Sequence, residues 1–215
     1  MDDRSWRFIK PRKLLAASLA EKGITDPRII LAIAEIPRHH FIDEALGHLA
    51  YEDRPLPIGY DQTISQPFTV AYQTQLLEVK PGDKILEIGT GSGYQAAVLK
   101  ALGAKVYTVE RIKGLYEETK ERLERLGYAP DYMAHADGTE GLPAFAPYDG
   151  IIVTAAAKEI PPALLKQLKP GGKLVIPVGK GSQRMIRILK GKDESLIKEI
   201  YDQFRFVPLL KGKVS

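Results

Sequence analysis

The strongest constraint on the fold is a strand, a glycine turn and a helix start in residues 85–98, Ile-Leu-Glu-Ile-Gly-Thr-Gly-Ser-Gly-Tyr-Gln-Ala-Ala-Val. The β-type run Lys84–Ile88 stops at Gly89, Gly91 and Gly93, and a helix-forming run follows at once. Glycines in such a turn permit positive φ and let a ligand approach the backbone, while the first N–H groups of the helix lack partners inside it. The pattern predicts a small-molecule site at the end of a strand.

The glycine spacing and two acidic residues indicate which molecule binds there. In the dinucleotide fingerprint GxGxxG the third glycine would fall at position 94, which is Tyr, so a pyrophosphate ligand is disfavoured. Glu87 suits a cationic ligand better than a phosphate, and Glu110 lies about 20 residues further on, where an acid grips a ribose diol. Together they resemble the nucleotide half of class I methyltransferases, whose donor S-adenosylmethionine carries amino and sulfonium groups. A glycine-rich turn that binds nothing is the alternative.

Composition indicates one ordinary globular domain. The chain has 215 residues, 44% of them hydrophobic and 27% charged, and its net charge of +4 is the sum of mixed signs rather than a basic patch. The absence of Cys excludes disulfides and thiolate catalysis. No apolar run reaches about 18 residues, and Met1–Lys10 lacks a leader pattern. The expectation is a cytoplasmic monomer with no nucleic-acid or membrane partner; His39 and His40 have no third ligand, so no metal is expected.

The order of helical and strand patterns predicts an α/β, doubly wound, mostly parallel sheet with N-terminal helices. A single domain over 1–215 is expected, with a helical cap and active-site loop in 1–80 and the nucleotide-binding sheet and C-terminal strands in 81–215. Asp137 ends a short strand, where doubly wound folds place ligand contacts, although a simple Asp-Gly turn is the alternative. The patterns predict helices at 8–23, 28–36, 69–79, 112–126 and 161–168, a loop at 51–66, a turn at 169–172, strands at 131–136, 148–155 and 173–178, and an antiparallel pair at 184–189 and 196–201.

Several distinctive segments together resemble the protein-L-isoaspartate (D-aspartate) O-methyltransferase family from about Leu14 to the C-terminus. The glycine motif alone resembles only the superfamily, whereas the loop Ile64-Ser65-Gln66-Pro67 combined with Phe206-Val207-Pro208-Leu209 is specific to this family. The matching segments in full are 59–67, 86–95, Val109-Glu110-Arg111, 149–156, 169–179 and 205–209. The resemblance implies a seven-stranded class I methyltransferase (Rossmann-like) sheet. It also implies methylation of the α-carboxylate of L-isoaspartyl, and D-aspartyl, residues in damaged proteins, with S-adenosyl-L-homocysteine as product.

The resemblance also assigns roles to residues. Ser65 is the implied active-site serine, between the donor methyl and the substrate carboxylate. Ile64 and the segment Val207, Pro208 and Leu209 are implied to hold the substrate backbone. The implied donor-binding residues are Glu87, Gly89, Thr90, Gly91, Glu110 for the ribose, and Asp137 with Gly138 for the adenine.

The residue types agree with carboxyl methylation. A carboxylate with a pKa near ~4 is already ionised at neutral pH, so the nucleophile needs no general base, and the loop around Ser65 contains no His or Cys. A cap at the start of the following helix is the alternative role for Ser65. The alternatives for the whole chain are methylation of another carboxylate or of a nucleic acid, a nicotinamide oxidoreductase, and a non-catalytic nucleotide sensor. Amino methylases usually carry an Asn/Asp-Pro-Pro-aromatic motif where this chain has Val153-Thr154-Ala155-Ala156.

Overall fold

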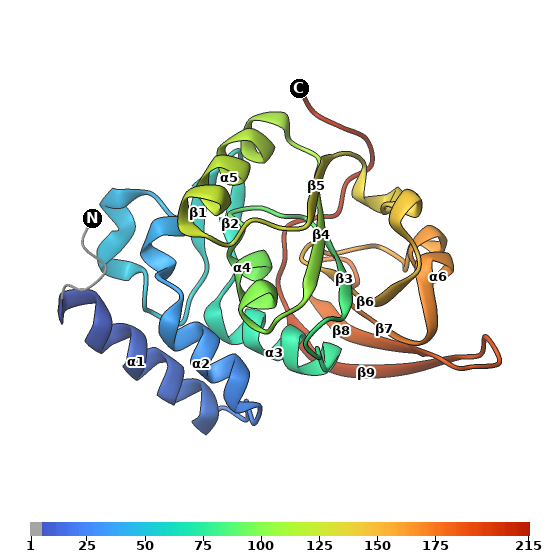
Figure 1. Cartoon of the computed structure of the whole chain (residues 1–215), viewed down its shortest axis with the longest axis horizontal. Coiled ribbons are helices and arrows are strands. Elements are labelled where there is room, and N and C mark those ends of the chain that lie inside the picture. The colour runs from blue at the N-terminus through green and yellow to red at the C-terminus, as the bar shows by residue number, and fades with distance from the viewer. Residues whose placement is uncertain (1–5) are drawn as a thin grey trace.

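A twisted sheet flanked by helices dominates the computed structural model, which describes residues 6–215 (Figure 1). Residues 1–5, the start of the predicted cap, lie outside the described residues. The α-helices are α1 (Trp6–Glu21), α2 (Pro27–Glu35), α3 (Pro67–Leu77), α4 (Tyr94–Ala101), α5 (Lys113–Leu126) and α6 (Pro162–Gln167). Short 3-10 helices are η1 (Arg38–Phe41), η2 (Glu44–Leu49), η3 (Gly138–Glu140) and η4 (Pro143–Phe145).

The strands form two sheets. They are β1 (Leu56–Gly59), β2 (Gln62–Ile64), β3 (Lys84–Ile88), β4 (Lys105–Glu110), β5 (Tyr132–His135), β6 (Tyr148–Val153), β7 (Leu168–Val178), β8 (Gln183–Lys190) and β9 (Leu196–Phe204). The large sheet has seven strands in the order β5-β4-β3-β6-β7-β8-β9, parallel from β5 to β7 and antiparallel from β7 to β9. The predicted fold class and the antiparallel C-terminal pair are therefore confirmed.

The chain reverses direction across the sheet between β3 and β6. From β3 it proceeds through β4 to β5 on one side, and β6 then begins the other side. In open α/β sheets ligands bind at such a switch point, outside the carboxyl ends of the strands. The glycine turn after β3 lies at this position.

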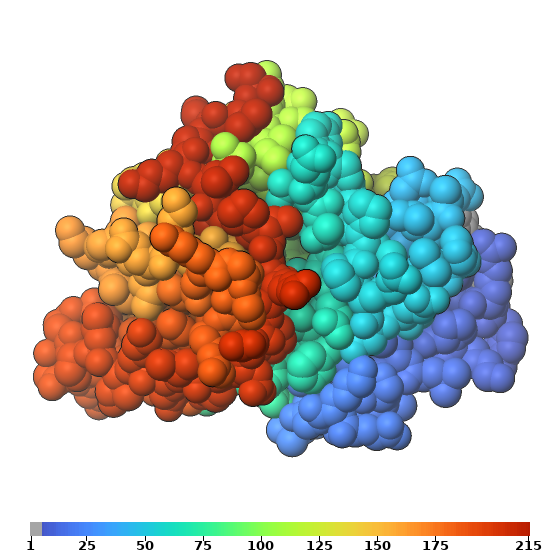
Figure 2. Space-filling view, turned by 180° about the vertical axis from the view of Figure 1, so that it is seen from behind, coloured from blue at the N-terminus to red at the C-terminus, as the bar shows by residue number. Residues whose placement is uncertain are grey.

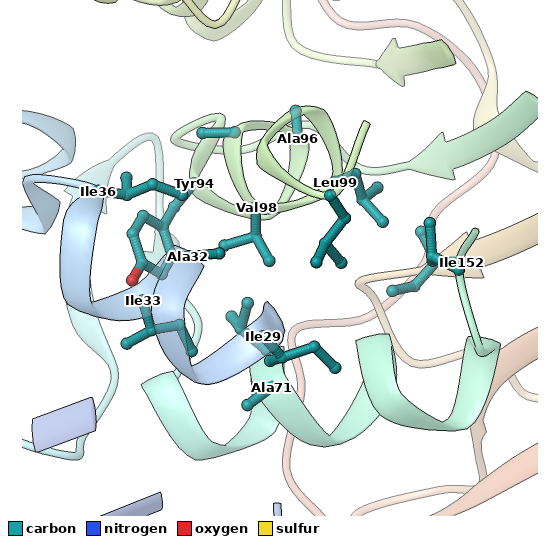
Figure 3. Packing of buried hydrophobic residues seen from close by; sticks show 14 of the residues in the cluster. Ile29, Ala32, Ile33, Ile36, Ala71, Tyr94, Ala96, Val98, Leu99 and Ile152 are labelled. Carbon is teal, nitrogen blue, oxygen red and sulfur yellow. The ribbon is translucent and has the colours of Figure 1, made fainter. Parts of the chain in front are cut away.

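Helices cover both faces of the sheet because alternate residues of the buried strands point to opposite faces. Ile85, Ile152 and Val175 belong to one buried cluster together with residues of α1 to α4, while neighbours such as Leu86, Ile151 and Leu174 belong to a second cluster with Leu164 of α6. Figure 3 shows α2, α3 and α4 meeting in the first cluster, where Ile29 and Ala71 face Val98 and Leu99. The N-terminal helices are thus continuous with the core that supports α4.

Two sequence expectations are corrected. The segment 51–66, predicted as a loop, contains the antiparallel hairpin β1–β2, whose turn places Tyr60 and Asp61 at positive φ. Residues 169–172, predicted as a turn, lie inside β7, where the pairing with β6 shifts register and Gly171 has a φ of 82°. A bulge, rather than a separate turn, accommodates the Pro-Gly-Gly sequence in the strand.

Candidate active site

A cavity lies at the carboxyl ends of β3 and β6, at the switch point of the sheet. Its lining comes from the glycine turn after β3, the end of β4, strand β2 and the segment 207–210 that follows β9. Figure 2 shows the cyan segment, which carries β2 and α3, lying beside the red C-terminal segment on this side of the molecule. The fold thus brings together segments distant in sequence.

The glycine turn approaches the cavity closely because its residues lack or bury their side chains. Gly89, Thr90 and Gly91 all line the cavity. Gly89 has a φ of 92°, and a Cβ built there would lie 2.6 Å from Oγ1 of Thr154. That hydroxyl donates to the carbonyl oxygens of Ile88 at 3.0 Å and Gly89 at 2.5 Å. Thr154 therefore fixes the turn and itself lines the cavity, a role that no motif in the sequence indicated.

Glu110 lies where the sequence predicted a ribose-binding acid. Its side chain is 4% exposed and lines the cavity. Oε2 accepts the N–H of Gly91 at 2.9 Å, and Oε1 accepts those of Arg111 at 2.8 Å and Ile112 at 3.0 Å. A carboxylate has about four acceptor positions. About one therefore remains for a ligand hydroxyl, in a geometry that the backbone holds rigidly.

Glu87 does not reach the cavity. It is fully buried, and Oε2 accepts a hydrogen bond from Oγ1 of Thr108 at 2.5 Å, whereas Oε1 has no partner among the described residues. Burial, reinforced by the nearby Glu110 charge, raises the pKa of Glu87 to about 8. The side chain is therefore largely neutral at pH 7, and the expected direct contact with a cationic ligand is not supported by its position. A hydroxyl pair, Thr90 and Thr108 at 2.7 Å, connects Glu87 to the glycine turn.

Asp137 and Gly138 play different parts. Gly138 lines the cavity, and a Cβ at that position would lie 2.5 Å from Cγ2 of Ile88. Asp137 is not among the lining residues: Oδ1 accepts the N–H and hydroxyl of Thr139, each at 2.8 Å, and Oδ2 accepts the N–H of Gly212 at 2.6 Å. The carboxylate shapes the Asp-Gly turn and secures the C-terminal segment, so the geometry favours the turn alternative for Asp137.

Ser65 lines this first cavity and also a second cavity beside it, and Ile64 before it is buried in the wall of the first. The helix-cap alternative for Ser65 is not what the structure shows. The cap residue of α3 is Gln66, which makes no side-chain cap bond, and Oδ1 of Asp53 accepts the N–H of Phe68 at 2.8 Å. The Ser65 hydroxyl has no hydrogen-bond partner among residues 6–215 and is available to a ligand.

The segment Val207, Pro208 and Leu209 lines the same cavity. It pairs with Ala156 just beyond β6: the N–H of Ala156 donates to Val207 O at 2.8 Å, and the N–H of Leu209 donates to Ala156 O at 2.7 Å. In a parallel ladder the middle residue points its backbone groups to the opposite side. The Pro208 carbonyl is therefore directed away from Ala156, and Pro208 has no N–H to satisfy.

The second cavity shares Thr63, Ser65, Thr154 and Val207 with the first cavity. Its remaining lining is aromatic and polar: Pro55, Gln66, Phe68, Thr69, Ser182, Asp202, Gln203, Phe204, Arg205 and Phe206. The two cavities therefore adjoin along these four shared residues, of which Ser65 is one.

Gln95 at the start of α4 supplies a buried acceptor that the sequence analysis missed. Thr74 donates its hydroxyl proton to the Val70 carbonyl at 2.7 Å, so its oxygen accepts from the Gln95 amide at 2.9 Å. The Gln95 atom facing Thr74 is therefore the NH₂ group, and Oε1 is the other amide atom. That oxygen is buried, has no partner among the described residues, and belongs to a side chain that lines the first cavity.

Within residues 6–215 no group of three or more His, Asp or Glu side chains is arranged to hold a metal ion, and no helix is long and apolar enough to cross a membrane. The adjacent histidines lie in η1, where the ring of His39 stacks on Phe8 with centroids 3.9 Å apart. The contact between His39 and Phe8 packs η1 against α1.

The parallel sheet, the switch-point cavity and the acid at the end of β4 together define a class I methyltransferase. Comparison with known proteins identifies the family. Residues 10–214 match the family model for protein-L-isoaspartate(D-aspartate) O-methyltransferase, and the chain belongs to that family. A protein-L-isoaspartate O-methyltransferase of Christiangramia forsetii is 52% identical over 209 residues, which is 97% of this chain and 98% of that protein.

Solved structures agree with the assignment. One described as protein-L-isoaspartate O-methyltransferase superimposes with a TM-score of 0.81 and 31% identity; the match covers 92% of this chain and 65% of that one. A putative Plasmodium falciparum member of the family, solved in complex with S-adenosyl-L-homocysteine, superimposes with a TM-score of 0.78 and 26% identity over 94% of this chain and 99% of that one. The chain is thus a methyltransferase enzyme of this family.

Proposed function

We propose that this chain transfers the methyl group of S-adenosylmethionine to the α-carboxylate of L-isoaspartyl residues in damaged proteins, and to D-aspartyl residues as the family description includes. The observation that carries the proposal is the position of Ser65, shared by the donor cavity and the adjoining cavity. A polar hydroxyl without a base beside it fits a nucleophile that arrives already ionised.

The donor fits the residues that line the first cavity. Glu110 offers an acceptor to the ribose, and Gly138 leaves space where a side chain would collide with Ile88. We assign the donor's amino group to Oε1 of Gln95, because this buried acceptor lacks a partner among the described residues and the position of Glu87 does not favour that role. Replacement Gln95→Leu should weaken binding of S-adenosylhomocysteine in calorimetry, whereas unchanged affinity would remove Gln95 from the site.

Catalysis would rest on alignment. A carboxylate oxygen forms a bond to the methyl carbon as the carbon–sulfur bond breaks, the electron pair stays on sulfur, and no proton moves. The Ser65 hydroxyl would donate a hydrogen bond to one carboxylate oxygen and so direct the other toward the methyl group. Orienting reactants in this way can be worth roughly 7 to 11 kcal/mol.

The Pro208 carbonyl and Ile64 are the proposed contacts for the substrate backbone. An isoaspartyl residue has one extra methylene in the main chain and its free carboxylate on the α-carbon. Two contacts must therefore be made at once: the substrate main chain at Pro208 and the substrate carboxylate at Ser65. Only the isoaspartyl form has the spacing between main chain and carboxylate that allows both. Discrimination would come from backbone geometry rather than from a side-chain pocket.

Damaged proteins and isoaspartyl peptides are the proposed partners, and we propose a cytoplasmic monomer that binds neither nucleic acid nor membranes nor a metal. The mixed charges, with a net value of +4, support the absence of a nucleic-acid surface.

Transfer of a labelled methyl group to an isoaspartyl peptide tests the proposal. A methyl ester releases its label as methanol in mild base, whereas a methylated nitrogen retains it. Base-labile label on the peptide is expected. Label that appears only on nucleic acid, or donor binding without transfer to any isoaspartyl peptide, would replace the proposal by one of the alternatives.

A further inference from the structure

Arg38 lies in the segment Pro37–Phe41, which drew attention in the sequence only for its histidines. It is 0% exposed, in the short helix η1 between the N-terminal helices and the active-site hairpin. Its guanidinium carbon lies 5.7 Å from the ring centroid of Tyr94, a residue that lines the donor cavity. A fully buried cation needs hydrogen-bond acceptors around it.

The guanidinium holds three backbone carbonyl groups. Nη1 donates to Ala50 O at 2.6 Å, and Nη2 donates to Arg54 O at 3.2 Å and to Ser65 O at 3.0 Å. These carbonyls come from chain segments before and after the hairpin β1–β2. A planar group with several donors in fixed directions can satisfy them at once, whereas an ammonium group has a different geometry.

Burial of the Arg38 guanidinium removes its hydration, which is unfavourable for a charged group. Burial lowers the pKa of Arg38 to about 10, which leaves the side chain charged at neutral pH. Among the described residues its hydrogen-bond acceptors are carbonyl oxygens, and the charge of Asp53 offsets part of the effect of burial on its pKa. A buried charge that makes no ion pair destabilises the folded state unless hydrogen bonds compensate for it.

Asp53 holds the other side of the same loop. Its Oδ1 accepts the N–H of Phe68 at 2.8 Å, and its Oδ2 accepts the Gln66 amide at 3.1 Å and Nζ of Lys22 at 2.6 Å. The backbone around Ser65 is therefore held at two places. Arg38 binds the Ser65 carbonyl, and Asp53 binds the Gln66 side chain and the Phe68 N–H. Since the Ser65 hydroxyl has no partner among residues 6–215, its position depends on this backbone anchoring.

We propose that Arg38, with Asp53 as its counterpart, is a positioning residue that holds the Ser65 backbone so that the serine hydroxyl meets the substrate carboxylate. The inference rests on the proposed function for its kinetic consequence. Its structural part, the restraint of residues 62–68, stands independently.

A double-mutant cycle between Arg38→Lys and Ser65→Ala separates positioning from general stability. A misplaced hydroxyl should lower kcat for an isoaspartyl peptide by about tenfold or more, since small displacements are costly in rate. In the Ser65→Ala background the same substitution should cost less than about twofold, because residues acting through one group are not additive. Affinity for S-adenosylhomocysteine should change little in either background.

Arg187→Lys is the matched control. Arg187 donates to Leu76 O at 3.2 Å and pairs with Glu78 and Glu199 at the far end of α3. The change is the same in chemistry, because Arg187 is also a guanidinium that binds a backbone carbonyl. Below the melting temperature, Arg187→Lys should leave kcat near the wild-type value. Hydrogen exchange gives a readout without activity: Arg38→Lys should speed exchange in residues 62–68 and leave residues 84–99 unchanged.

Equal losses of kcat with and without the Ser65 hydroxyl, or wild-type kcat and exchange in Arg38→Lys, would overturn the proposal. If Arg38→Lys does not fold, Asp53→Asn carries the same cycle with the same expected non-additivity. If the wild-type protein methylates no isoaspartyl peptide, the proposed function fails, while the exchange of residues 62–68 still decides whether Arg38 restrains the loop.

Discussion

At the scale of single residues, the site depends on backbone groups fixed by buried side chains. Glu110 accepts three backbone N–H groups, and Thr154 donates to two carbonyl oxygens of the glycine turn. Each of these contacts lies within the chain itself, and backbone groups held in place in this way lose less conformational entropy when a ligand binds.

Glu110→Ala should weaken binding of S-adenosylhomocysteine by tens-fold or more in calorimetry, because loss of a hydrogen bond to a charged group costs about 1.5 to 3 kcal/mol. Glu121→Ala, which removes an exposed acid from α5, is the control and should bind normally. Equal affinities for the Glu110→Ala variant and the wild-type protein would remove Glu110 from the donor site.

Ser65→Ala should lower kcat by about tenfold to a hundredfold through loss of orientation, with donor affinity and melting temperature nearly unchanged. The expectation of unchanged stability follows from Asp53, which caps α3 in place of Ser65. Ser18→Ala removes a hydroxyl bonded to Leu15 O in α1 and serves as the control for kcat. A large fall in melting temperature that accounts for all lost activity would restore the helix-cap alternative.

At the scale of elements, the strand β3 and its glycine turn were predicted from the sequence, whereas the burial of the Glu87 side chain was not. Alternate residues of a strand share a face, and Ile85, on the same face as Glu87, belongs to the cluster beneath α4. Glu87 therefore points into the same core as Ile85. The motif showed where the ligand turn lies but not which side chains reach it.

Glu87→Gln should stabilise the protein increasingly as pH rises. The folded-state pKa of about 8 lies above the ordinary value of 4.5, so the native state retains a proton that the unfolded chain loses, and wild-type stability falls between these values. The linked free energy is on the order of a few kcal/mol. The difference in melting temperature, variant minus wild type, should be more positive at pH 9 than at pH 5. A difference independent of pH would show that Glu87 titrates normally.

At the scale of the whole molecule, one core joins the N-terminal helices to the sheet. Ile29 and Ile33 of α2 pack in the same cluster as Val98 and Leu99 of α4, the helix that follows the glycine turn (Figure 3). The C-terminal segment returns to the start of α5, where Lys113 N donates to Val214 O at 2.9 Å. Both ends of the described chain thus contribute to the surroundings of the donor cavity.

Ile33→Ala should lower the free energy of unfolding by about 2 to 5 kcal/mol, because it leaves a cavity in that shared core. The residue is 1% exposed. If residues 6–215 form one domain, urea unfolding followed by far-UV and by near-UV circular dichroism should give coincident, shifted transitions. Leu31→Ala, at an exposed position of the same helix, is the control. A separate early transition in the variant would instead divide the cap from the sheet.

The sequence was sufficient for the fold class because local patterns, the glycine turn and the buried parallel strands, specify it. The sequence also indicated that Glu110 lies near the turn, because its spacing from the turn follows from one βαβ unit. Contacts such as Arg38 to Ser65 and Thr154 to Gly89 join segments that come together only in the folded chain. No local pattern encodes them, so the residues that fix the catalytic loop and the turn could not be found in advance.

The most direct test of the central claim compares kcat/KM for two peptides that differ only in Asp or isoAsp at one position. Recognition of backbone geometry at Pro208, with the carboxylate at Ser65, predicts that the isoaspartyl peptide reacts about a hundredfold faster or more, because a misplacement of about 1 Å costs a factor of that order. Comparable values for the two peptides, or efficient methylation of free aspartate, would contradict the account and leave a carboxyl methyltransferase without isoaspartyl specificity.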